Sequence, residues 1–183
     1  RGVPTRENRL TRKIPETGRT AVQIRKSTAI DIPAIMQIYS DAKAYMIQTG
    51  NRNQWIGAYP QKTILQHDIT AGNSYVCTAD SRILCTFFFS IGHDPTYATI
   101  DNGAWLNDDP YGVIHRIAVA QHERGVATYC INWALSQCSN LKIDTHEDNK
   151  PMRKRLTKLS FTKCSTIYLD DGSPRIAFQK TEQ

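Results

Sequence analysis

The stretch YGVIHRIAVAQHERGVATYCINWALSQC, residues 111–138, decides the fold of this 183-residue chain. Its first half, residues 113–119, is rich in β-branched and apolar side chains and predicts a strand. A polar turn, QHERG, follows and ends at Gly125. The second half repeats apolar residues every three to four positions, which predicts a helix from about residue 125 to 138. A helix that starts at such a turn directs free backbone N–H groups into it, where they attract anions and above all phosphates.

The segments on either side of this stretch alternate between strand and helix patterns. We expect further strands at residues 21–27, 74–78, 83–91, 141–145, 164–169 and 175–179, and further helices at 28–50, 61–71 and 149–159. Residues 92–110 are rich in Asp, Asn, Gly and Pro, which predicts a loop that contains a short strand at 97–100. The order β-α-α-β-β-β-α-β-α-β-β predicts an α/β fold with a mixed, mostly antiparallel sheet and helices on both faces.

Composition indicates one ordinary globular domain. Hydrophobic residues make up 40% and charged residues 22% of the chain. No apolar run approaches the roughly 18 to 20 residues of a membrane helix, and the polar first residues show no secretory signal. The five cysteines are odd in number and lack C-x-x-C spacing, which argues against a zinc site or a disulfide framework. We therefore expect buried, reduced thiols in a cytoplasmic protein, with no metal.

The net charge of +6 is unevenly distributed along the chain. Residues 1–20 hold six basic and two acidic residues, a net of +4, so the remaining 163 residues carry only +2. A basic tail can bind nucleic acid, but the nearly neutral remainder argues against a nucleic-acid-binding protein. We expect residues 1–20 to be a flexible tail and residues 21–183 to form a single domain.

Two segments resemble signatures of the GNAT superfamily of N-acetyltransferases, and the element order from about residue 22 to 180 resembles that family as well. The family's Arg/Gln-x-x-Gly-x-Gly/Ala signature aligns with residues 122–127, where Gly125 and Ala127 match but His122 departs from Arg/Gln. Its Asn-x-x-Ala-x-x-x-Tyr-x-Lys-x-Gly-Phe signature aligns with residues 149–161. The matching residues there are Asn149, Lys158 and Phe161, whereas Met152, Leu156 and Ser160 replace Ala, Tyr and Gly. Three further segments, WLNDDPYGVIHRIAV, IDTHEDNKPM and DGSPRIAFQK, resemble a bacterial subgroup.

The resemblance implies that acetyl-coenzyme A (acetyl-CoA) is the acetyl donor. Its pyrophosphate would rest on the N–H groups of residues 124–128, and its pantetheine arm would pair with the strand backbone of residues 117–119. The parallel strands at 113–119 and 141–145 would separate to admit the arm, as an open strand edge can accept a linear amide chain. The implied donor-binding residues are Ile117, Ala118, Val119, Arg124, Gly125, Val126, Ala127, Thr128, Asn149 and Met152.

The resemblance also implies catalytic positions. His115 occupies the place of the Glu that serves many members as general base, and an imidazole with an ordinary pKa of about 6.5 suits that task near neutral pH. A hydrogen-bonded structural histidine is the alternative reading of His115. The family's usual general acid, a helix Tyr, is Leu156 here. Tyr168, Tyr111 and His146 are the candidate substitutes, and His146 is the second histidine expected at the site.

Aromatic residues occur in the loops that cover the acceptor pocket in this family. Trp55 and Trp105 could stack on an amine substrate there, or could instead anchor the loops to the core. The expected function is acetyl-CoA-dependent acetylation of a primary amine of a small molecule or peptide, in a protein that, like many relatives, forms a homodimer. A non-catalytic acetyl-CoA- or CoA-binding regulatory module is the alternative, favoured by Leu156 and His122.

Overall fold

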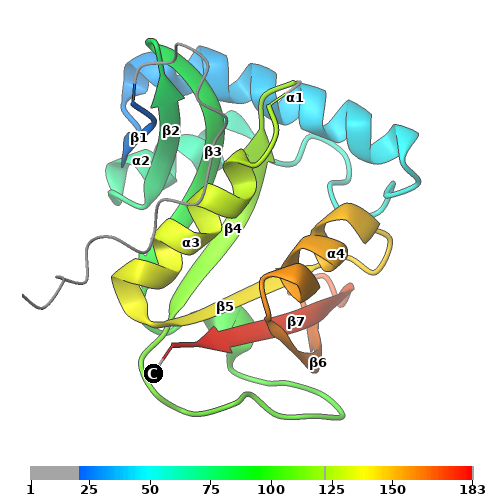
Figure 1. Ribbon diagram of the computed structural model, residues 1–183. Coiled ribbons are helices and arrows are strands. Elements are labelled where there is room, and N and C mark those ends of the chain that lie inside the picture. Colours follow the sequence, from blue (N-terminus) through cyan, green and yellow to red (C-terminus); the bar gives the residue numbers. More distant parts are fainter. Residues whose placement is uncertain (1–20, 122, 183) are drawn as a thin grey trace, which may run out of the picture.

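The structure is a computed structural model that describes residues 21–121 and 123–182. It contains one sheet flanked by helices (Figure 1). Its strands are β1 (Gln23–Lys26), β2 (Ser74–Ala79), β3 (Arg82–Ile91), β4 (Gly112–Val119), β5 (Asn140–Thr145), β6 (Thr162–Tyr168) and β7 (Pro174–Thr181). Its helices are α1 (Ile32–Gln48), α2 (Lys62–Thr70), α3 (Val126–Cys138) and α4 (Lys150–Lys158), with short 3-10 helices η2 (Ala29–Asp31) and η3 (Pro95–Tyr97). The element order is the predicted one.

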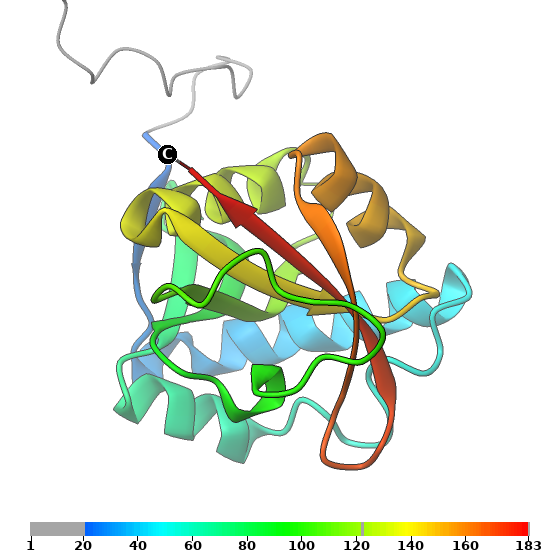
Figure 2. The same cartoon turned by 90° about the horizontal axis from the view of Figure 1, so that it is seen from below.

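The described strands lie in the order β1-β2-β3-β4-β5-β7-β6. Neighbouring strands are antiparallel except for β4 and β5, which run parallel. Helices α1 and α2 cover one face of the sheet and α3 and α4 cover the other (Figures 1 and 2). The prediction of a mixed, mostly antiparallel sheet between two helical layers is therefore confirmed.

Each helical layer packs on its own hydrophobic core. The apolar stripe of α3, including Cys130, Ile131 and Ala134, is fully buried in the core between α3, α4 and the sheet. On the opposite face Ile35 of α1 and Leu65 of α2 are buried in a second core. Burying one such leucine or isoleucine side chain stabilises the fold by about 1.5–3 kcal/mol, so the two cores fix both layers against the sheet.

The parallel pair β4 and β5 separates along its length. The two strands pair only through residues 112–114 of β4, with Ile114 opposite Ile143 as the last pair. Figure 1 shows the two strands diverging from there toward α4. From His115 onward, β4 thus has no partner strand on its β5 side in the described part of the chain.

An irregularity in β4 accompanies this separation. The register between β3 and β4 shifts between Thr86 and Phe88, so that Arg116 and Ile117 lie opposite a single residue of β3. Arg116 has a φ of 51°, which is rare for a residue with a side chain. Such a bulge bends a strand and re-aims its side chains, and it interrupts the alternation between the two sheet faces.

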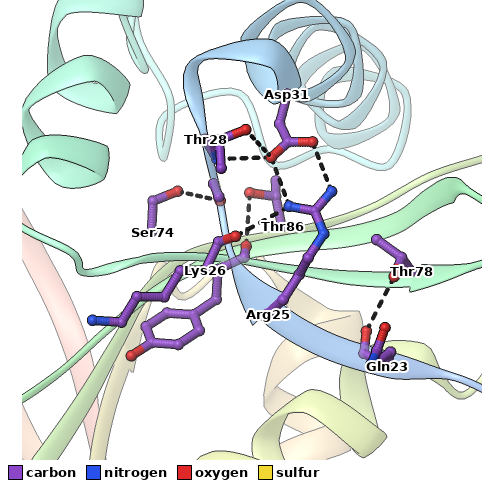
Figure 3. Close-up of polar contacts among 10 residues, drawn as sticks. Gln23, Arg25, Lys26, Thr28, Asp31, Ser74, Thr78 and Thr86 are labelled. Carbon is purple, nitrogen blue, oxygen red and sulfur yellow. Dashed lines mark hydrogen bonds and ion pairs between the residues drawn. The ribbon is translucent and has the colours of Figure 1, made fainter.

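A polar cluster joins β1 to α1 (Figure 3). The Arg25 guanidinium donates two hydrogen bonds to the Asp31 carboxylate, with N–O distances of 2.8 and 2.9 Å, and the same carboxylate accepts from the Thr28 backbone N–H. The hydrogen bond from Arg25 lowers the pKa of Asp31 to about 2. The predicted helix start at Thr28 is confirmed, because Thr28 caps η2, which leads directly into α1.

The loop at residues 92–110 differs from the prediction at one point. The expected strand at residues 97–100 is wrong, because Tyr97 ends the 3-10 helix η3 instead. Asp94 caps this helix by accepting a hydrogen bond from the Thr96 backbone N–H, and Pro95 occupies its first position. A proline after a capping Asp fixes a helical turn and removes a donor that a strand would need.

Other sequence expectations have mixed outcomes. The five cysteines are free. Cys77, Cys85 and Cys130 are buried as expected, whereas Cys138 and Cys164 are only half-buried. No described helix is long and apolar enough to cross a membrane. The basic tail of residues 1–20 lies outside the described residues.

Candidate active site

Two cavities adjoin where β4 separates from β5. The one that contains His115, called the histidine cavity, has a volume of about 590 Å³ and lies between β4, β5 and the loops at residues 51–59 and 169–173. The one that contains Gly125, called the glycine cavity, has a volume of about 730 Å³ and lies between α1, the end of β4 and the start of α3. Four residues line both cavities: Met46, Ile117, Asn149 and Met152. A ligand could therefore extend from one cavity into the other.

The start of α3 forms one wall of the glycine cavity. Gly125 precedes the helix with a φ of 78°, and no side chain of the described residues caps the first turn. A Cβ placed on Gly125 would meet no described atom within 4 Å, so the space in front of the helix is open. The first N–H groups of a helix have no partner within it, and they carry its positive end. With Arg124 beside them, they suit a phosphate group.

Most of the predicted donor-binding residues line this cavity. Those that do are Ile117, Ala118, Val119, Arg124, Gly125, Ala127, Asn149 and Met152. Val126 and Thr128 do not, and the Val126 side chain is buried in the core. Sequence reasoning missed the opposite wall, which comes from the second half of α1, including Tyr45 and Met46. Its only sequence signal, an apolar helical stripe, also describes a core helix.

His115 lies between two carboxylates in the histidine cavity. Its Nε2 is 2.7 Å from Oδ2 of Asp94, and its Nδ1 is 3.5 Å from Oδ1 of Asp144. The Tyr97 hydroxyl donates a hydrogen bond of 2.7 Å to the same Oδ1 of Asp144. Sequence reasoning selected His115 but neither acid, because Asp94 comes from the loop before β4 and Asp144 from β5.

This arrangement changes the charge that His115 carries. Burial lowers the pKa of His115, but the hydrogen bonds and charges of Asp144 and Asp94 outweigh it and raise the pKa to about 9. Burial raises the pKa of Asp94, but the hydrogen bond and charge of His115, together with the hydrogen bonds from Thr96, outweigh burial and lower the pKa to about 2. Near neutral pH His115 is thus an imidazolium between two carboxylates. The expected pKa of about 6.5 does not hold for this site.

Arg116 is a second cation in the histidine cavity that the sequence did not indicate. Its Nη2 donates a 2.6 Å hydrogen bond to Asp68 of α2, and its Nη1 donates to the Tyr59 hydroxyl at 3.3 Å. Because of the bulge in β4, the consecutive residues His115, Arg116 and Ile117 all line the cavity. A regular strand would have turned the middle one of the three to the opposite face.

The remaining candidates for proton transfer lie elsewhere. His146 lines neither cavity, and its Nδ1 accepts a 3.1 Å hydrogen bond from the Asp148 backbone N–H, which stabilises the turn before α4. Leu156 is fully buried in the core. Tyr111 and Tyr168 line neither cavity, and the Tyr111 hydroxyl accepts from the Asp94 backbone N–H. Among the described tyrosines, Tyr59 lines the histidine cavity and Tyr45 the glycine cavity.

The two tryptophans expected over the acceptor pocket have different positions. Trp55 lines the histidine cavity and also packs edge-on against Tyr39 in the core. Trp105 does not line the cavity. Its Nε1–H donates to the Tyr97 carbonyl at 3.0 Å, and its ring packs against the Lys142 ammonium at 4.2 Å. Trp105 thus anchors the loop at residues 92–110 to the sheet. Among the described residues, no group of three or more His, Cys, Asp and Glu could hold a metal ion.

Comparison with known proteins gives the chain a family. It is 30% identical to an acetyltransferase of the GNAT family from Streptococcus agalactiae 2603, over 88% of this chain and 96% of that one, with a TM-score of 0.80. A GNAT-family acetyltransferase from Bacillus cereus ATCC 10987 is 20% identical over 90% of this chain and 99% of that one, with a TM-score of 0.58. Arabidopsis thaliana NAA60, crystallised in complex with acetyl-CoA, is 14% identical over 88% and 98%, with a TM-score of 0.62.

At their lower identities, the Bacillus and Arabidopsis structures show the fold alone. No family model and no curated protein matches the chain. The Streptococcus protein is matched over nearly its whole length. From the first signature segment, Glu123, Arg124, Gly125 and Ala127 line the glycine cavity, and the second segment spans α4. The chain therefore belongs to the GNAT family of acetyltransferases.

Proposed function

We propose that the protein is an acetyl-CoA-dependent N-acetyltransferase that acts on a primary amine of a small molecule or peptide. One observation carries this proposal: the two cavities meet where β4 leaves β5, with the open start of α3 on one side and His115 on the other. A cofactor with a phosphate end and a reactive end could bind along this path. The acceptor amine would approach from the histidine cavity.

The residues of the glycine cavity fit acetyl-CoA. The first N–H groups of α3 and the Arg124 guanidinium would hold the pyrophosphate. The β5 side of residues 117–119 would offer backbone groups to the amide groups of the pantetheine arm, because no strand pairs there in the described chain. Met152 and Asn149 would line the arm at the junction of the cavities. When bound, acetyl-CoA supplies the acetyl group as a thioester.

His115 would take up the proton that the acceptor amine must lose before it can react. At neutral pH most of the acceptor is an ammonium ion and most of His115 is an imidazolium, so the productive state is scarce. Asp94 and Asp144 have lowered pKa values and do not accept protons at neutral pH. They hold the imidazole in place and set its pKa. The reaction should therefore accelerate as the pH rises toward 9.

Donor binding is tested by thermal unfolding with acetyl-CoA, with CoA and with pantetheine alone. A ligand that binds the native state raises its melting temperature in a concentration-dependent way. We expect acetyl-CoA and CoA to stabilise the protein and pantetheine to have little effect, because it lacks the phosphates. No stabilisation by millimolar acetyl-CoA would contradict the donor assignment.

A non-catalytic CoA-binding module is the second candidate. The observation that favours it is Leu156, which is fully buried where the family's helix Tyr would supply a proton to the departing thiolate. In that case acetyl-CoA would stabilise the protein, but no amine would release free CoA thiol above the rate without protein. A panel of amines with a thiol reagent separates the two candidates.

A further inference from the structure

We propose that Arg175 of β7 binds a carboxylate of the acceptor, so that the substrate is an amino acid or a short peptide with a free carboxyl group beside the reacting amine. This inference rests on the N-acetyltransferase function proposed above and specifies its substrate. It is carried by a buried guanidinium that lines the histidine cavity and forms no ion pair with a carboxylate of the described residues.

Arg175 is only 6% exposed, yet its contacts are with neutral groups. Its Nη1 donates to the Pro174 carbonyl at 2.8 Å and to the Ser173 hydroxyl at 3.4 Å, and its Nη2 donates to the Gln54 carbonyl at 3.2 Å. These three contacts use N–H groups of Nη1 and Nη2 only. A guanidinium has five N–H donors in a planar fork that matches a carboxylate, so donors remain for a ligand.

The other side chains of the cavity form no direct ion pair with this guanidinium. In the described part of the chain, Arg175 forms no ion pair with a carboxylate, in contrast to Arg116, which pairs with Asp68. Asp144 is engaged by His115 and Tyr97, and Asp171 accepts from Ser173. Burial lowers the pKa of Arg175, and the more distant charges of Asp144 and Asp171 only partly oppose this. A buried charge without a partner is costly, and an anionic ligand would remove that cost.

The histidine cavity also contains carboxylates that suit the amine end of such a substrate. The carboxylates of Asp94, Asp144, Asp170 and Asp171 line the same cavity. These four carboxylates outnumber the three cations of the cavity wall, His115, Arg116 and Arg175, so the cavity attracts an ammonium group and opposes a ligand with two or more negative charges and no positive one. A zwitterion with one ammonium and one carboxylate matches this pattern better than a simple amine or a phosphate ester.

Position on the sheet supports the same reading. Arg175 is on β7, which pairs with β5 so that Thr145 lies opposite Ile176. Asp144 of β5 and His115 of β4 lie across the gap between the separated strands. Arg175 donates a hydrogen bond to the Gln54 carbonyl and so attaches the loop at residues 51–59 to the sheet. The same loop contains Trp55, which lines the cavity. An acceptor held by Arg175 would therefore lie between this loop and His115.

The first test compares matched acceptors with the wild-type protein. We would measure kcat/KM for free CoA thiol release with a panel of amino acids, their carboxamides, the corresponding decarboxylated amines, and phosphoethanolamine as the phosphate-bearing amine. We expect the best amino acid to exceed its carboxamide and its decarboxylated amine by at least tenfold. The carboxamide has the less basic amine, so a preference for the acid cannot come from easier deprotonation.

The second test uses Arg175→Gln, with Arg175→Lys as the conservative variant. Arg175→Gln should reduce the preference for acid over carboxamide to less than threefold, mainly by raising KM for the acid. Arg175→Lys should retain part of the preference. Arg153→Gln is the matched control, because Arg153 also donates to a backbone carbonyl, that of Glu147, and lines neither cavity.

The outcomes separate this inference from the proposed function. Equal or better turnover of carboxamides, simple amines or phosphoethanolamine by the wild type would overturn the inference and leave the N-acetyltransferase function standing. Equal losses for acid and carboxamide in Arg175→Gln would show a structural role for Arg175 and would also overturn it. If Arg175→Gln fails to fold, the wild-type comparison still decides. An absence of turnover with every amine would contradict the proposed function itself.

Discussion

At the scale of single residues, the site depends on the charge state of His115. Its two ring nitrogens face Asp94 and Asp144, which raise its pKa to about 9. Replacing Asp94 by Asn removes one of these charges, so the pKa of His115 should fall by about one unit. The rising limb of the pH–rate profile should then move to lower pH by the same amount.

This prediction is checked by kcat/KM against pH for the wild type and Asp94→Asn with one acceptor. An acceptor amine titrates in the same range, but its own pKa is unaffected by the substitution. A limb that stays in place in Asp94→Asn would assign it to the amine and would leave His115 as a structural histidine.

Stability should depend on pH through the same residue. A histidine whose pKa is raised from 6.5 to about 9 on folding stabilises the native state fully below pH 6.5, and this contribution is lost as pH rises through 9. Its size is on the order of 3 kcal/mol. We expect the free energy of unfolding in urea to fall between pH 6 and pH 9.5 by more in the wild type than in His115→Gln. Parallel pH dependence in the two proteins would contradict the raised pKa.

Residue roles were only partly predictable from the sequence. His115 could be selected because it stands at a family position within a strand. Asp94 could not, because it is 21 residues away in a loop whose path depends on η3. Arg116 faces the cavity only because of the bulge in β4, and Arg175 appears as an ordinary strand residue until its burial and its lack of an acidic partner are known.

At the scale of elements, the proposed donor site is tested most simply at the start of α3. Gly125→Asp should weaken acetyl-CoA binding at least tenfold, because a carboxylate would stand where the phosphates bind. Gly125→Asn is the matched control, since it has the same size and the same strain at a φ of 78° without the charge. Titration calorimetry measures both. Equal affinities of the two variants would show that this helix start does not hold the phosphates.

Trp105 is predicted to affect catalysis through the position of its loop, residues 92–110, and not through direct contact with the acceptor. Trp105 and Tyr111 enclose the Lys142 ammonium, at 4.2 and 3.8 Å from the ring centres, and so attach the loop to β5. Trp105→Ala should lower the free energy of unfolding by about 3 kcal/mol. It should also lower kcat, because Asp94 belongs to the same loop, and it should leave acetyl-CoA affinity unchanged.

Unfolding in urea and steady-state kinetics check this together. If Trp105 instead stacked on the acceptor, as the sequence allowed, stability would be nearly unchanged and KM for the acceptor would rise.

Helices and strands themselves were largely predictable from periodicity and capping residues. The exception, residues 97–100, shows the limit of pattern reading, because a short apolar segment next to a capping Asp and a proline can turn as well as extend. The second half of α1 was predicted as a helix but not as a cavity wall. The local sequence pattern does not show that α1 packs over the end of β4, because this packing is part of the tertiary structure.

At the scale of the whole molecule, the separation of β4 and β5 organises everything else. It opens one sheet in the middle, with the glycine cavity at the start of α3 on one side and the histidine cavity on the other, and the two cavities share lining residues. The sequence predicted the mixed sheet and the strand–turn–helix at its centre. The two-cavity arrangement required the structure, because it depends on which strands diverge and on which loops close over the gap.

The most direct measurement is acetyl transfer itself, followed by mass spectrometry of the acceptor and by free thiol release from isotopically labelled acetyl-CoA. The wild type should yield one labelled N-acetyl product per thiol, and His115→Ala should form it at least a hundredfold more slowly while still binding acetyl-CoA. Labelled product formed equally fast by His115→Ala would contradict the catalytic role of His115, and no product with any amine despite tight donor binding would contradict the proposed enzyme.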